Sequence, residues 1–560
     1  MKKIFIKTIA AAALTIGLTG CVNDLDISSI DPQSSPSADP MGLLAKCYAT
    51  LGLTGQDGGS GNGDLSDDEG ESGFYRTTFN LQELPTDECM WAWQTDQDIP
   101  QITMINWNSS SIRVQWAYTR LTYDITLFNN YLTQVPDDEA NSQYRAEVRF
   151  LRALHYWYML DLFGKSPFKT EFDISTLPVE YSGPELYEWL DNELTEIEGI
   201  MSDNGVGVGA YNNDENFGRA DLGAVYMLHA RLALNSEVYT NGAVKDYDKA
   251  INYCNQLIGS SYDLSRNAKN GYSGYQQLFM ADNDVNTEAR QEIILPIRQD
   301  GLRTRQYGGS LMLIAGTRIG GMPNYGMTAS WSCLFARASM TQKFFSDLSQ
   351  VPLVTDEIPE KATTDQLDAL DLAAGATTDQ LIALANDDRA ILYSGCRGGV
   401  RSVQTDEISG FTNGLSIVKW TNIKSDGTAG SDVSWPDTDI PLFRLAEAYL
   451  TRAEAKWRQS GNLNDALADI NVLRDRAHAP RLNIISDKMQ ICDEWCREFY
   501  MEGRRRSDLV RFGYFTGSEY LWDWKGGMAN GTSVDSHFNV YSIPADDIRN
   551  NGNLTQNDGY

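Results

Sequence analysis

The sequence predicts a mainly helical protein in which pairs of helices stack into a scaffold and long irregular segments lie between them. Three observations lead to this fold class. Several segments repeat apolar residues at helical spacing, and helix pairs of about 35 residues recur along the chain, close to the tetratricopeptide period. Residues 260–440 are instead irregular and rich in Gly, Asn and aromatic side chains. With 560 residues, 42% of them hydrophobic and 22% charged, the composition excludes a disordered chain and a polytopic membrane protein.

The first 20 residues are predicted to be a lipoprotein signal peptide. Lys2 and Lys3 form a basic start, and the apolar run at 9–18 is about half the ~20 residues that a spanning helix needs. The segment ends in Leu-Thr-Gly followed by Cys21, which resembles a lipobox in which the Cys is acylated. We therefore expect lipid attachment at Cys21 and a hydrated, acylated tether over residues 21–40. The alternative is an ordinary signal peptide with a Cys at this place by chance.

The helical segments follow in chain order. A first helical element is expected at 41–54, and a stripe of residues at spacings of three and four predicts a long helix over 140–163. That stripe consists of Tyr144, Val148, Leu151, His155, Tyr158 and Leu162. Further pairs are predicted at 221–238 with 246–258, and at 441–459 with 463–477, the last pair broken at Gly461. Such hairpins bury their apolar faces only against one another, so stacking is expected.

Charge and aromatic content narrow the possible partners. The formal net charge is −30, which disfavours nucleic acids and polyanionic glycans as sequence-independent partners. Aromatic residues make up 11% of the chain, including 13 Trp and 27 Tyr. A protein that stacks on neutral sugar rings needs such a surplus, although many of these rings belong to a core in any interpretation.

A search for catalytic chemistry finds little. The sequence contains no HExxH, GxSxG or GxxxxGK[ST] motif and only four His. The Asp87-Glu88 pair could serve a glycoside hydrolase, but among 76 acidic residues a pair is expected by chance. The acidic segment 57–71 leaves a structural Ca²⁺ open, although no register gives the EF-hand spacing; no other metal or cofactor is predicted. The seven Cys that follow Cys21 are an odd, scattered set, so we expect buried thiols and no disulfide framework.

Motifs spread over the whole mature chain resemble those of one family. They are NLQELPTDE at 80–88, RFLRAL at 149–154, DLFG at 161–164, FRLAEAYL at 443–450, NVLRDRA at 471–477, REFYMEGRRRSDLVR at 497–511 and the terminus NLTQNDGY at 553–560. In this order, and with the lipobox, they resemble the SusD-like (RagB/SusD) glycan-binding lipoproteins of bacterial outer membranes. A plain tetratricopeptide scaffold would share the helical period but neither the lipobox nor the terminus.

The resemblance implies a fold and a function. It implies four tetratricopeptide-like helical hairpins and a loop-rich half that carries the ligand site, in a single domain over 41–560. Helical elements are expected at roughly 41–54, 111–260 and 440–515, and ligand-binding loops at roughly 55–110 and 261–440. The implied protein is not an enzyme. It is a cell-surface lipoprotein of the outer membrane that binds a neutral oligosaccharide or polysaccharide and delivers it to a SusC-like TonB-dependent transporter for nutrient uptake.

The resemblance also implies the site residues. Trp91, Tyr307 and Trp331 match an arc of aromatic platforms, and Asp68 and Arg76 match the polar pair ahead of the NLQELPTDE motif. Asp96 is the polar residue expected to follow the first platform, and Trp93, Arg318 and Asn324 are weaker neighbours. Two other functions stay open. The protein could deliver a peptide or glycoprotein cargo to the transporter in the same way, as a lid on it, or it could be a surface glycoside hydrolase.

Overall fold

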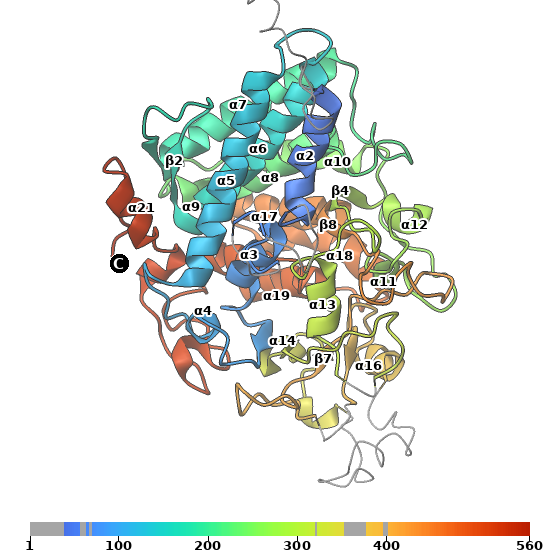
Figure 1. Ribbon diagram of the computed structural model, residues 1–560. Coiled ribbons are helices and arrows are strands. Elements are labelled where there is room, and N and C mark those ends of the chain that lie inside the picture. The colour runs from blue at the N-terminus through green and yellow to red at the C-terminus, as the bar shows by residue number, and fades with distance from the viewer. Residues whose placement is uncertain (1–38, 56–62, 66–69, 320–321, 352–376, 396–400) are drawn as a thin grey trace, which may run out of the picture.

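A computed structural model describes residues 39–55, 63–65, 70–319, 322–351, 377–395 and 401–560. Helices gather in one part of the molecule, and short elements joined by long loops fill the other (Figure 1). The mainly helical fold class is thereby confirmed, whereas the count of four hairpins and the single-domain boundaries stay predictions. The described residues do not include Asp68, Cys21, the signal peptide or most of the tether.

The scaffold is a series of helices that pack on their neighbours in chain order. They are α2 (Pro40–Gly52), α5 (Ile112–Gln134), α6 (Ser142–Phe163), α7 (Gly183–Asp203), α8 (Leu222–Leu234), α10 (Tyr247–Ile258), α17 (Leu445–Ser460) and α18 (Leu467–Arg476). Helix α5 packs on α6, α6 on α7, α7 on α8, α8 on α10, and α17 on α18. Helix α10 packs directly on α17 although almost two hundred residues separate them in sequence. The scaffold therefore continues across the long irregular segment as if that segment were an insertion.

Local sequence fixes where these helices begin and end. Ser182 and Glu185 form a capping box at the start of α7, with a proline in the first turn. Helix α6 ends at Gly164 and α17 ends at Gly461, both with a left-handed backbone (φ of 69° and 76°) that glycine adopts without strain. The Gly461 break predicted from the sequence is thus confirmed. Within the described ranges no helix combines the length and the hydropathy needed to cross a bilayer.

Two-stranded antiparallel sheets and shorter elements complete the structure. The strands are β1 (Cys89–Trp91) with β5 (Leu334–Ala336), β2 (Lys165–Phe168) with β3 (Val179–Ser182), β4 (Ile293–Ile297) with β8 (Ile440–Arg444), and β6 (Leu392–Tyr393) with β7 (Ser416–Ile417). The β2–β3 pair joins scaffold helices α6 and α7. The remaining helices are α3 (Phe74–Glu83), α4 (Ile99–Thr103), α9 (Ser236–Tyr239), α11 (Gly274–Gln277), α12 (Thr287–Arg290), α13 (Ser310–Gly316), α14 (Ala338–Thr341), α16 (Thr378–Ala385), α19 (Lys488–Phe499), α20 (Arg505–Phe512) and α21 (Ala545–Asn550). Short 3₁₀ turns are η1 (Leu348–Gln350), η2 (Leu463–Ala466), η3 (Lys525–Gly527) and η4 (Ser536–Asn539).

Two expected boundaries differ from the structure. Residues 441–444 were expected in a helix but form strand β8, because they pair with β4 and close the base of the insertion. Helix α3 occupies 74–83 inside the interval expected to be loop, and all ten of its residues are buried. The helix buries polar side chains such as Arg76, Asn80 and Glu83 together with its apolar ones, so its sequence does not show the apolar stripe from which the other helices were predicted. The expectation of buried thiols is confirmed for Cys47, Cys89, Cys254, Cys333, Cys492 and Cys496.

A buried ion-pair network joins the scaffold to the inserted segment. The Glu498 carboxylate on α19 accepts hydrogen bonds from Arg444 (2.6 Å) at the end of β8, from Arg476 on α18, and from Arg389 (3.3 Å) after α16. All four side chains are fully buried. Burial alone would raise the pKa of Glu498, but the guanidinium groups of Arg476, Arg444 and Arg389 outweigh it and hold the pKa well below its usual range. Glu498 is therefore ionised, and its neighbours depend on that charge.

We predict that Glu498→Gln lowers the free energy of unfolding by about 3–5 kcal/mol, because it removes one of the counter-charges of three buried guanidinium groups. Chemical denaturation measures this loss. Glu196→Gln is the control, since Glu196 is also ion-paired (2.6 Å to Arg149) but 67% exposed, and it should cost less than about 1 kcal/mol. Equal, small losses in both variants would show that the Glu498 network does not stabilise the fold.

Candidate functional site

Three aromatic rings from the inserted segment form a half-buried cluster. The ring centroids of Tyr307 and Trp331 are 6.1 Å apart with planes at 42°, and those of Tyr307 and Trp435 are 5.2 Å apart with planes at 56°. Each ring packs on the core by one part of its surface and leaves the rest accessible. We call Tyr307, Trp331 and Trp435 the aromatic cluster.

Short elements hold the cluster in place. Tyr307 lies just before α13, and Trp331 returns to the end of that helix, where its backbone N–H donates to Ala315 O (2.7 Å). Strand β5 follows directly and pairs with β1, with Leu334 opposite Trp91. The pairing continues beyond the strands through the Ala92 N–H and Cys333 O (2.8 Å). The chain that leaves β1 therefore runs beside the chain that carries Trp331.

Arg76 on α3 connects these two parts of the site. Its Nη1 donates to Tyr307 O (3.3 Å) and its Nη2 to the Glu71 carboxylate (3.0 Å). Its guanidinium lies 5.6 Å from the centre of the Trp91 ring. Glu71 also accepts from Arg113 on α5, so the chain before α3 is tied to the scaffold. Arg76 is 5% exposed, and in this position it braces the backbone of Tyr307.

The expected exposure of Trp91 is wrong. The residue is 1% exposed, and its indole Nε1 donates to Asp96 Oδ2 (2.9 Å). The cause is the environment of β1, because both faces of this strand are covered. Trp91 packs into the main core, while Met90 and Ala92 pack with Phe335 in a separate apolar cluster. A platform for a ligand is not available from within this strand.

Trp93 is the first aromatic residue that emerges from β1. It is half-buried and meets the Trp91 ring edge-on, with centroids 6.1 Å apart and planes at 88°. A tight turn follows, in which the Asp96 N–H donates to Trp93 O (3.1 Å), so the half-exposed Asp96 carboxylate lies close to Trp93. The site therefore brings together Tyr307, Trp331 and, through Arg76, the chain with Trp93 and Asp96.

Some of this could have been found from the sequence. The residues 89–93 read Cys-Met-Trp-Ala-Trp, an uninterrupted apolar run that is typical of a buried strand, and only its last member precedes polar residues. Trp435 was missed altogether. It lies in a polar loop whose turn depends on the Asp432 carboxylate, and no spacing relates it to Tyr307 across more than a hundred residues.

The carboxylate pair of the hydrolase hypothesis has a structural role. Asp87 and Glu88 are buried; Asp87 accepts two hydrogen bonds from Arg505 (2.7 and 2.9 Å) and Glu88 accepts from the Met501 N–H (3.0 Å). Both carboxylates tie the chain before β1 to α20 and the turn that precedes it. In the part of the chain that the structure describes, no group of three or more His, Cys, Asp and Glu side chains could hold a metal ion.

The fold and this site define a mainly helical protein that presents aromatic rings from loops on a rigid scaffold and buries its adjacent carboxylate pair. A sequence model of the SusD family matches residues 399–560. The chain is 57% identical to the starch-binding protein SusD of Bacteroides thetaiotaomicron, over 100% of both chains. It therefore belongs to the SusD family.

Solved structures show the same fold at low sequence identity. A SusD-like protein from Bacteroides fragilis matches with a TM-score of 0.64 and 18% identity over 95% of this chain and 100% of its own. Surface glycan-binding protein A from Bacteroides thetaiotaomicron, solved with laminarihexaose, matches with a TM-score of 0.61 and 18% identity over 92% of this chain and 98% of its own.

The structure predicts opposite behaviour for the two neighbouring tryptophans. Trp91→Ala should cost about 3–5 kcal/mol of stability, because it opens a cavity in the core and leaves Asp96 without its indole donor. Trp93→Ala should cost clearly less, because part of that ring already faces solvent. Thermal melts of the two variants beside the unmodified protein make the comparison. A Trp91→Ala protein as stable as Trp93→Ala would contradict the placement of the two rings.

Proposed function

We propose that this protein binds an oligosaccharide or polysaccharide at the aromatic cluster and the adjoining Trp93, and that its ligand is an α-glucan of the starch type. The observation that supports the site is the contact of three half-buried rings on loops above the scaffold. The relative at 57% identity is described as starch-binding, and that identity extends over the whole chain. This supports the choice of glycan.

The geometry of the rings suits a curved chain. Sugar rings present an apolar C–H face that stacks on aromatic planes, while their hydroxyl groups need planar donors and acceptors. The planes in the aromatic cluster are inclined to one another by 42° and 56°, so they form a curved surface. Helical α-glucans follow a curved path, whereas ribbon-like glycans are extended and would contact one plane at a time.

The polar residues have different parts in this proposal. Asp96 is half-exposed beside Trp93 and can accept a hydrogen bond from a sugar hydroxyl. Arg76 acts through Tyr307, whose backbone it holds, and is a positioning residue. Asp68, which lies outside the described residues, stays a candidate contact from the sequence.

We further propose that the protein is attached to the outer membrane through a lipid on Cys21 and delivers glycan to a SusC-like TonB-dependent transporter. Helix α2 begins at Pro40, the last residue of the predicted tether. At about 3.3–3.6 Å a residue, a fully extended tether over 21–40 reaches on the order of 70 Å. A body on such a tether can swing over a transporter without leaving the membrane. A peptide or glycoprotein cargo is the alternative for this role.

Trp331→Ala should weaken binding to starch about tenfold or more. Stacking on an aromatic face is worth on the order of 1–3 kcal/mol by alanine substitution, and about 1.4 kcal/mol corresponds to one decade in Kd. Affinity electrophoresis against neutral polysaccharides measures the change. Trp457→Ala is a matched control, because Trp457 is also half-buried but lies on scaffold helix α17.

Two results of this experiment would argue against the proposal. Normal starch binding by a folded Trp331→Ala protein would remove the aromatic cluster from the site. New reducing ends after long incubation of the unmodified protein with polysaccharide would identify a hydrolase instead.

Cys21→Ala should release the protein from the outer-membrane fraction or retain it as a precursor, because the lipid is the attachment that the sequence provides. Membrane fractionation compares the variant with the unmodified protein. Mild detergent extraction of the unmodified protein should also recover a TonB-dependent transporter. Unchanged fractionation of the variant would refute the anchor, and recovery of the monomer alone, with glycan present, would argue against delivery to a transporter.

A further inference from the structure

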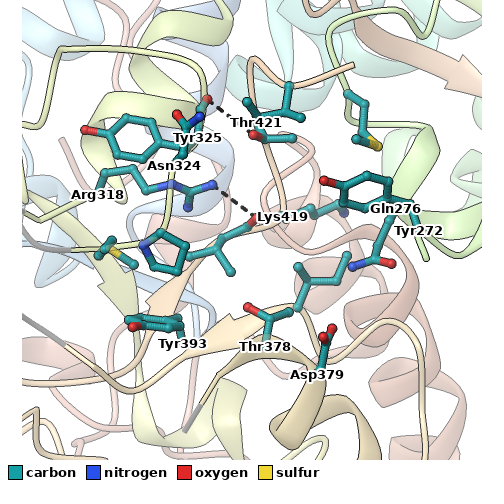
Figure 2. A pocket seen from close by; sticks show the side chains of 16 residues that line it. Tyr272, Gln276, Arg318, Asn324, Tyr325, Thr378, Asp379, Tyr393, Lys419 and Thr421 are labelled. Atoms are coloured by element: carbon teal, nitrogen blue, oxygen red, sulfur yellow. Dashed lines mark hydrogen bonds between the residues drawn. The ribbon is translucent and has the colours of Figure 1, made fainter. Parts of the chain in front are cut away.

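A cavity of about 220 Å³ is lined in part by residues 322–325, on the stretch of chain that leads to Trp331. Figure 2 shows side chains from several distant segments that converge on it. They include Tyr272, Gln276, Arg318, Tyr325, Thr378 and Tyr393. The Ser332 N–H donates to Arg318 O (2.9 Å), so the backbone of Arg318 lies beside the chain at Trp331. The cavity shares no lining residue with the aromatic cluster.

Arg318 is a buried cation without a counter-ion. It is 4% exposed, and among the described residues no carboxylate lies within ion-pairing distance (4.0 Å) of its guanidinium. Its Nη2 donates to Trp420 O (2.7 Å) and Val418 O (3.3 Å), and its Nη1 donates weakly to Thr317 Oγ1 (3.4 Å). Burial lowers the pKa of Arg318 to about 10, an effect that the nearby Tyr325 offsets only in part.

Other buried arginines in the protein show how unusual this is. Arg389, Arg444 and Arg505 each face at least one carboxylate within 3.0 Å. Arg337 has no such partner, but its guanidinium donates to four backbone carbonyls. Arg318 has five N–H donors and makes hydrogen bonds to three uncharged acceptors among the described residues. Arg318 therefore keeps unused N–H donors and a positive charge that no carboxylate among the described residues balances. Both lie at the wall of the cavity, where an anion could bind to them.

The wall combines apolar side chains, such as Met280, Ile391 and Ile423, with aromatic and polar ones that could contact a sugar ring. Tyr325 lies over the Arg318 guanidinium (5.2 Å from the ring centre), and Tyr393 and Tyr272 add two further aromatic rings. Thr378 at the start of α16 contributes a hydroxyl group, and the exposed Asp379 lies on the opposite side of the pocket from Arg318 (Figure 2). A carboxylate there would accept hydrogen bonds from sugar hydroxyls while the anionic end of the ligand lies at Arg318. With a volume of about 220 Å³, the cavity has room for several waters or one small ligand.

We propose that this cavity is a second ligand site, which binds one hexuronic acid residue with its carboxylate on Arg318. The planar guanidinium matches a carboxylate in geometry, and in a buried setting such a charge-assisted pair is stronger than a neutral hydrogen bond. The ligand is a free sugar acid or a uronic acid residue at the end of a glycan. The site is distinct from the aromatic cluster and does not depend on the function proposed for it.

Calorimetric titration with D-glucuronate and D-glucose tests the proposal, because the two sugars differ only in the carboxylate at C6. Glucuronate should bind at least tenfold more tightly than glucose. Arg318→Gln should reduce glucuronate binding at least tenfold, and Arg318→Lys, which keeps the charge but loses the planar fork, should retain part of it. Equal binding of the two sugars, no binding of either, or normal glucuronate binding by Arg318→Gln would overturn the proposal.

A second variant tests the cavity without changing Arg318, and so separates loss of the ligand site from a structural effect of the Arg318 substitutions. Thr378→Phe fills the cavity from α16 and leaves Arg318 with its carbonyl partners. It should abolish glucuronate binding while the melting temperature and the affinity for starch stay unchanged. Undiminished glucuronate binding in this variant would place the sugar acid elsewhere and overturn the proposal.

Comparison of free glucuronate with an oligosaccharide that ends in glucuronate distinguishes the two sources. Tighter binding of the oligosaccharide, lost in Arg318→Gln, supports a glycan end as the ligand. Binding of the free acid alone, with the same dependence on Arg318, supports a separate small-molecule site.

Discussion

The structure depends on one buried carboxylate. Glu498 on α19 lies between guanidinium groups from three different parts of the chain, Arg476 in the scaffold, Arg444 where the inserted segment ends, and Arg389 within that segment. Ions of both signs lose their hydration here, so the arrangement is stable only while every charge keeps its partner. The inserted segment is consequently fixed to the helices by interactions that tolerate little displacement.

The same principle extends from this network to the ligand site. Asp87, just before β1, is held by Arg505 on α20, and β1 pairs with β5. The loops that carry Trp93 and Trp331 therefore start from anchored strands, and Arg76 holds the backbone of Tyr307 between them. Rings fixed in this way lose little conformational freedom when a ligand binds, so more of the stacking energy remains as affinity.

The sequence correctly predicted those elements in which burial of one face produces a periodic pattern of apolar residues. The stripe at 140–163 and the Gly461 break were predicted because a helix with one apolar face repeats every three to four residues. Prediction failed where burial is complete. Helix α3 buries its polar residues as well as its apolar ones, so it was expected as loop. Strand β1 is covered on both faces, so Trp91, which the resemblance implied as a platform, is buried. The ion-pair partners of Arg505 and Arg506 could not be predicted either, because these are Asp87 and Asp161, more than three hundred residues away. Contacts between residues so far apart in the sequence produce no spacing pattern from which they could be predicted.

The division between scaffold and insertion also explains how the fold and the ligand site can vary independently. Because α10 packs directly on α17, the scaffold closes on both sides of the segment between them, and β4 and β8 seal its base. Changes in the loops beyond that base leave the helix packing and the Glu498 network intact as long as Arg389, the one residue there that is ion-paired with Glu498 among the described residues, is kept. Structures with 18% identity and TM-scores of 0.61–0.64 fit this picture, since helix faces constrain volume and polarity more than particular residues. The aromatic cluster and the Arg318 cavity both draw residues from the inserted segment, and the two sites are linked because the Ser332 N–H, next to Trp331, donates to Arg318 O. Substitutions near this contact can therefore change both sites while the scaffold helices keep their packing.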